Sequence, residues 1–167
     1  KDLNLSVAMS LQKFFESGGT QVLLTRSDDN GIYDVSGSIK NKKVSDIKNR
    51  EEFIKSVDAD AFISIHMNKY STTQPHGAQV FYSNFQGSKE FALALQSSVA
   101  DNLQTDNKRV IKPAGKDIYL LNHASVPCVI VECGFLSNKQ ELEKLKMQDY
   151  QSKMAFAITS GIMDFYE

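Results

Sequence analysis

The chain has 167 residues, enough for one domain with a full hydrophobic core and too few for two. Its composition, 41% hydrophobic and 23% charged, is that of a folded globular protein and excludes a disordered chain. A formal net charge of −1 without a dense Lys/Arg run argues against nucleic-acid binding, and no apolar run approaches the roughly 20 residues that span a bilayer.

The first predicted element is an amphipathic helix over residues 1–19 that stops at Gly18-Gly19. Its predicted apolar face consists of Leu5, Ala8, Met9, Leu11 and Phe15. The helical pattern starts at residue 1, with no methionine, capping residue or targeting segment before it. We therefore expect the chain to begin inside a longer protein.

A short buried strand is predicted next, over residues 20–26, followed by a polar loop over residues 27–43. Ser45 is the expected cap of a helix over residues 46–57. The remaining elements are strands over 60–66, 77–83, 117–123 and 127–135, and helices over 87–106 and 139–165, the last broken near Gln148-Asp149. This alternation predicts an α/β fold, with a mostly parallel or mixed central sheet flanked by helices on both faces.

Two cysteines, Cys128 and Cys133, lie in one predicted strand. Their odd spacing points them to opposite faces, so we expect buried free thiols and no disulfide between them. An apolar strand also argues against either one as a reactive nucleophile.

Two predicted central strands each end on a titratable residue, His66 in FISIH and Glu132 in VIVE. A carboxylate in such a strand is costly to bury unless a charge or metal compensates it. If the strands are neighbours, the two side chains face one crevice, as in zinc hydrolases that pair a histidine ligand with a carboxylate acid/base. Structural roles for both residues stay open at this point.

Other polar residues give weaker signals. His76 lies in a polar loop and is expected to be exposed, while His123 either lines the same crevice or lies on a surface loop. Catalytic zinc usually takes three protein ligands, and no motif in the chain completes such a set. Arg26 and Arg50 are expected to form structural pairs, with binding of an acidic substrate as the alternative.

Several segments together resemble the zinc-dependent N-acetylmuramoyl-L-alanine amidases over nearly the whole chain. The most specific are SIHMN and VPCVIVECGFLSNKQELEKL, and VLLTRSDD, SDIKNREEFIKSVDADAF and HGAQVFYS also match. The DIKNR helix and YLLNHASVP are most similar to the spore germination-specific branch, which acts on the spore cortex.

The resemblance implies roles for individual residues. His66 matches a zinc ligand and Glu132 the general base or acid. Separately from the resemblance, Asn68 and His123 are predicted to contact substrate. The family's other ligands, a histidine in a GHGG-like segment and a glutamate just before the first helix, have no counterpart here. We therefore expect residues 1–167 to form one amidase catalytic domain without its N-terminal strand and first zinc-ligand motif, with the missing ligands upstream of Lys1.

The activity implied is hydrolysis of the amide bond between N-acetylmuramic acid and L-alanine in peptidoglycan, in cell-wall remodelling or spore cortex modification. Zn²⁺ is the implied cofactor, peptidoglycan the substrate, and an activating protein a further expected partner. The resemblance places the protein outside the cytoplasm, in the cell wall or spore envelope, with a signal or anchor upstream. A non-catalytic relative that binds the cell wall or a partner through the same groove is the alternative.

Overall fold

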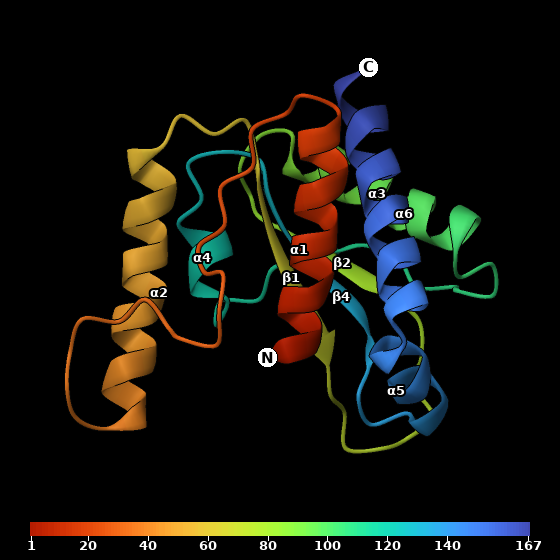
Figure 1. The fold of residues 1–167 in the computed structure, drawn as a ribbon, viewed down its shortest axis with the longest axis horizontal. Helices are drawn as coiled ribbons and strands as arrows, with labels where there is room; N and C mark the ends of the chain where they lie inside the picture. Colours follow the sequence, from red (N-terminus) through yellow and green to blue (C-terminus); the bar gives the residue numbers. More distant parts are fainter.

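A computed structural model describes residues 1–167. Its elements in chain order are α1 (Asp2–Ser17), α2 (Ile39–Ser56), β1 (Phe62–Asn68), β2 (Gln79–Tyr82), α3 (Ser88–Asn102), β3 (Lys112–Pro113), α4 (Tyr119–Asn122), β4 (Cys128–Phe135), α5 (Lys139–Lys146) and α6 (Gln148–Tyr166). α1 and α6 lie side by side over the sheet, and α2 stands apart from them (Figure 1).

The four strands form one sheet in the order β1-β4-β2-β3. β1 and β4 are parallel, β4 and β2 antiparallel, and β2 and β3 parallel. The predicted mixed sheet with flanking helices is confirmed.

One face of the sheet carries the main hydrophobic core. Val129, Val131 and Cys133 of β4 alternate toward this face and are fully buried. They pack with the inner faces of α1, α3 and α6, where Val7, Leu11, Phe91, Leu95, Met154 and Ile158 are buried. These three helices cover this face of the sheet.

The opposite face is covered more sparsely, by α2 and α4. Phe62 and Cys128, which alternate toward this face, contact the same small cavity as Ile54 of α2 and Leu120 of α4. Strand alternation places His66 and Glu132 on this face too. The lighter cover leaves the carboxyl ends of β1 and β4 accessible.

Three predicted elements differ in the structure. Residues 20–26 are not a strand, because they form no ladder with the sheet and Leu23 is 50% exposed. Residues 117–123 form the helical turn α4, since a short apolar run fits a helix as well as a strand. α2 begins at Ile39, well before the predicted start, because the Ser38 hydroxyl accepts the N–H of Asn41 and caps it there.

The other predicted elements are present near their expected positions, and the two-residue strand β3 was not predicted. α1 ends at Gly18-Gly19, and Gly19 takes a left-handed conformation with φ of 83°. Its buried face centres on Val7 and Leu11, whereas Met9, which was predicted to face the core, is 40% exposed. Cys128 and Cys133 are free and buried, and no helix is long and apolar enough to cross a membrane.

Candidate active site

His66 and Glu132 lie next to each other on neighbouring parallel strands. They are register partners of β1 and β4, and partners in a parallel pair point to the same face. Each of them directly follows a run of apolar strand residues. The predicted proximity of His66 and Glu132 is therefore confirmed.

Glu132 carries a carboxyl group with unmet hydrogen-bonding capacity. Its Oε2 atom is buried and has no hydrogen-bond partner. Burial raises the pKa of the Glu132 carboxyl to about 7, and no cation offsets that effect. A carboxyl with a pKa near neutrality and a free oxygen is suited to accept and return a proton.

The buried, unpartnered carboxyl group of Glu132 is expected to lower the free energy of unfolding of the protein. Glu132→Gln should raise the free energy of unfolding of the metal-free protein by about 1–2 kcal/mol at pH 8, because it removes a buried, unpartnered charge. Chemical denaturation with a chelator present measures this. The exposed Glu143→Gln change should stay within about 0.5 kcal/mol. A less stable Glu132→Gln protein would contradict the prediction.

His66 lies among positive groups. Burial lowers the pKa of its imidazole below the usual range, and the charges of Arg50 and Arg26 lower it further. A neutral imidazole is the form that binds metals. Arg50 is itself paired, since its Nε lies 2.7 Å from Asp46 Oδ2, and its Nη1 also contacts Thr25. The predicted structural pairing of Arg50 is thus confirmed.

Arg26 behaves differently from the prediction. It donates to the carbonyl oxygens of Asp28 and Lys1, at 2.6 and 3.1 Å, and not to a carboxylate. These bonds tie the start of the 27–38 loop to the start of α1. Arg26 also lies within electrostatic range of His66.

The donors present fit part of a zinc site. His66 offers a neutral imidazole as a ligand, and Glu132 offers a carboxyl oxygen without a partner for proton transfer beside it. However, no group of three or more His, Cys, Asp or Glu side chains in residues 1–167 is arranged to hold a metal ion. Because catalytic zinc takes three protein ligands, these residues do not complete a site by themselves.

A bulge follows Glu132 directly. His66 pairs with Glu132 and Asn68 with Phe135, so β4 contains one residue more than β1 over this interval. Bulges beside active sites reorient the side chains next to them. Here the extra residue returns Phe135 to the same face as Glu132.

Glu141, in the first turn of α5, holds this region in place. Its two carboxylate oxygens each accept a backbone N–H at 2.8 Å, one from Phe135 and one from Gly77. The bond to Gly77 attaches the loop between β1 and β2 to the end of β4. The SNKQE segment therefore supports the site structurally.

Glu141→Ala is expected to destabilise the protein by about 2–4 kcal/mol, because it leaves two part-buried N–H groups without acceptors. In a domain of this size the melting temperature should fall by about 5–12 °C. Thermal unfolding followed by circular dichroism checks this, with Glu143→Ala two positions along as the exposed control. Equal melting temperatures for the two variants would show that the Glu141 bonds contribute nothing.

The other predicted site residues are more scattered. Asn68, the last residue of β1, lies two positions beyond His66, and its carbonyl accepts the N–H of Leu136. His76 is exposed, as predicted. His123 is exposed at the end of α4, where its Nδ1 lies 2.8 Å from the Tyr119 carbonyl oxygen. Contact of Asn68 and His123 with substrate remains a prediction.

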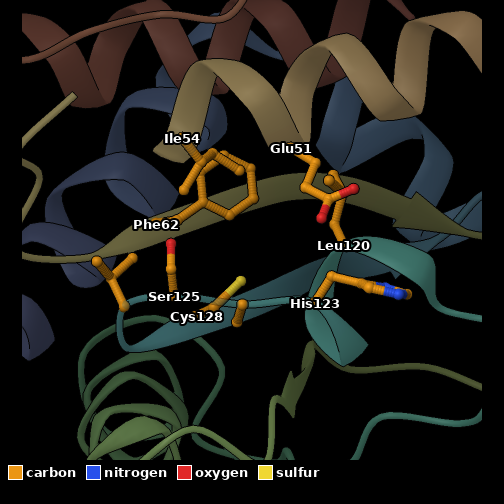
Figure 2. A pocket seen from close by; sticks show the side chains of 9 residues that line it. Glu51, Ile54, Phe62, Leu120, His123, Ser125 and Cys128 are labelled. Carbon is orange, nitrogen blue, oxygen red and sulfur yellow. The ribbon is translucent and has the colours of Figure 1, made fainter. Parts of the chain in front are cut away.

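His123 lines a small cavity away from the carboxyl ends of the strands. The cavity encloses about 10 Å³, and its walls include Phe62 and Cys128, the first residues of β1 and β4. Figure 2 shows Glu51 and Ile54 of α2 on one side and His123 and Cys128 on the other. Neither His66 nor Glu132 lines it. It has room for about one water molecule and none for a substrate.

Two polar residues near Glu132 were not predicted from the sequence as site residues. Gln79 of β2 is the antiparallel register partner of Glu132, and Arg109 Nη1 donates to Gln79 Oε1 over 2.7 Å. Arg109 follows α3 in an irregular segment, so no strand or helix pattern pointed to this location. Only the sheet order brings Arg109 near the site.

The mixed sheet with flanking helices, and the placement of His66 beside Glu132 on neighbouring strands, define the chain as an α/β protein with a candidate acid–base site. The Amidase_3 model, described as N-acetylmuramoyl-L-alanine amidase, matches residues 1–164. The chain belongs to this family of N-acetylmuramoyl-L-alanine amidases, which hydrolyse peptidoglycan.

Individual relatives agree with the family. The germination-specific N-acetylmuramoyl-L-alanine amidase of Bacillus subtilis is 29% identical over 168 residues, covering 99% of this chain and 70% of that protein. The CwlD amidase of Clostridioides difficile, solved in complex with the GerS lipoprotein, superposes with a TM-score of 0.96 at 38% identity, over 99% of this chain and 85% of that one. The amidase AmiC2 of Nostoc punctiforme superposes with a TM-score of 0.82 at 26% identity, over 99% of this chain and 83% of that one.

Proposed function

We propose that this chain is the catalytic part of a zinc-dependent amidase that cleaves the bond between N-acetylmuramic acid and L-alanine, with the spore cortex as its site of action. The observation that carries the chemistry is the placement of His66 beside Glu132, whose Oε2 has no partner. The germination-specific relative and CwlD support the cortex assignment.

In this proposal His66 is one zinc ligand, and the others come from outside residues 1–167. Support comes from Arg26, which donates to the Lys1 carbonyl oxygen at the start of α1 and whose charge also acts on the pKa of His66. The start of α1 therefore lies near the same site. A further strand along β1, which is at the edge of the sheet, would carry the remaining histidine and give residues 20–26 a neighbour.

When bound, zinc supplies a Lewis acid for the scissile carbonyl and lowers the pKa of water. Glu132 accepts a proton from the water that attacks the lactyl carbonyl carbon. It then delivers that proton to the departing L-alanine nitrogen as the C–N bond breaks. The products are a free lactyl carboxyl group and a stem peptide with a free amino terminus. Burial, and after it the charges of Arg50 and Arg26, lower the pKa of His66 and so favour its neutral form.

We also propose action outside the cytoplasm, as for the cell-wall amidases among its relatives, with an activating protein as partner. The CwlD structure in complex with a lipoprotein supports such a partner. Full zinc occupancy and full rate for the isolated full-length enzyme would contradict the need for an activator.

The test of the function is direct. Full-length protein with zinc is incubated with purified peptidoglycan, and mass spectrometry follows new lactyl carboxyl groups and new L-alanine amino termini in equal amounts. Binding to peptidoglycan without zinc and without cleavage would favour the non-catalytic alternative. Cleavage of ordinary peptides but not of the muramoyl amide would indicate a zinc peptidase.

A further inference from the structure

The guanidinium of Arg109 lies on the same face of the sheet as Glu132. Its Nη1 donates to Gln79, the β2 residue directly opposite Glu132. Its guanidinium carbon lies 4.4 Å from the centre of the Phe135 ring. The bulge in β4 places Phe135 on the Glu132 face, because Phe135 pairs with Asn68. Two independent contacts therefore set the guanidinium beside the site.

The guanidinium is held in one orientation. Besides Gln79 and Phe135, its Nε donates to the carbonyl oxygen of His76 over 2.8 Å. The backbone N–H of Arg109 is also bonded, to Asn107 Oδ1 at 2.9 Å. Such fixation reduces the entropy lost when a ligand binds.

Arg109 also has unused binding capacity. No carboxylate lies within 4 Å of its guanidinium, whereas Arg50 is neutralised by Asp46. An arginine has five N–H donors, and Arg109 uses one on Nε and one on Nη1. The remaining donors, both on Nη2 and one on Nη1, form the fork that binds a carboxylate through two parallel hydrogen bonds.

We propose that Arg109 binds a free carboxylate of the stem peptide and so determines which peptides are accepted. This inference rests on the proposed function. Adjacent strands lie about 4.8 Å apart, so a peptide crossing from Glu132 over β2 travels about 5–10 Å to reach the guanidinium. An extended chain spans about 3.5 Å per residue. The carboxylate of the residue that follows L-alanine in the stem therefore lies at about the right distance to contact the guanidinium.

The placement also assigns a direction to the substrate. His66, Glu132, Gln79 and Arg109 follow one another across β1, β4 and β2 toward β3. With the scissile amide at His66 and Glu132, the peptide runs over β2 toward Arg109. The glycan then lies on the β1 side.

The test compares two muropeptides that differ only in the second residue of the stem, which carries either a free carboxylate or a carboxamide. For full-length, zinc-loaded protein, Arg109→Met should lower kcat/KM for the carboxylate substrate about 10- to 100-fold, mainly through KM. The carboxamide substrate should change by less than about 3-fold. Lys108→Met, the exposed neighbouring cation, is the matched control and should leave both values unchanged.

The ratio of the two kcat/KM values is internal to each protein, so partial unfolding of a variant cancels. A ratio unchanged by Arg109→Met in an active enzyme overturns this inference alone. Failure of the unmutated protein to cleave either substrate removes the proposed function and this inference with it. Calorimetry in a Glu132→Gln background gives a second readout, in which Arg109→Met should abolish the preference for the carboxylate ligand.

Discussion

Replacing Glu132 with alanine is expected to reduce amide cleavage about 10²- to 10⁴-fold, the range that a positioned general acid or base contributes. The reason is the geometry of the residue: its Oε2 is buried without a partner, and burial raises the pKa of the carboxyl to about 7. It is therefore able both to accept the proton of water and to return it to the leaving nitrogen. Initial rates on purified muropeptides, with full-length zinc-loaded protein, measure the loss.

Two further variants make the Glu132 result specific. Glu132→Gln keeps the size of the side chain but cannot accept the proton, so it should be nearly as inactive as Glu132→Ala. Glu143→Gln, an exposed glutamate paired with Lys146, should retain full activity. Zinc content should change little in the Glu132 variants, since the proposed role is proton transfer. Near-normal cleavage by Glu132→Gln would remove Glu132 from the mechanism.

His66→Ala is expected to weaken zinc binding by at least about 100-fold and to abolish cleavage. Even the hydrogen-bond partners of metal ligands contribute 10- to 100-fold in affinity, and loss of a ligand exceeds that. His66 is suited to the role because burial and nearby positive charge keep its pKa low and its imidazole neutral. Competition with a chelator of known affinity measures the zinc dissociation constant of the full-length protein.

His76→Ala is the matched control for the histidine experiment. His76 lies in the exposed loop between β1 and β2, and its side chain makes only a 3.3 Å contact with the Gln74 carbonyl oxygen. Zinc affinity and cleavage should both be unchanged. Retention of one zinc per chain by His66→Ala, with the fold intact by circular dichroism, would show that His66 is not a ligand.

The pattern of apolar residues was sufficient to predict most of the fold. The central strand β4 is a continuous apolar run because it is buried between its neighbours, and α5 and α6 separate at the predicted break near Gln148. The prediction was wrong where local pattern is ambiguous. Residues 117–123 are short and apolar, which suits the turn α4 as well as a strand. Residues 20–26 have strand character, but a strand also needs a partner.

The sequence by itself determined the chemistry of the candidate site. A histidine and a glutamate each ended an apolar run, and burying a carboxylate such as that of Glu132 is costly enough to indicate function. Only the tertiary structure decided that they are neighbours, because strand order and register depend on contacts between segments 66 residues apart. The same holds for Gln79, Arg109 and Glu141, which reach the site through pairing and hydrogen bonds that no local pattern encodes.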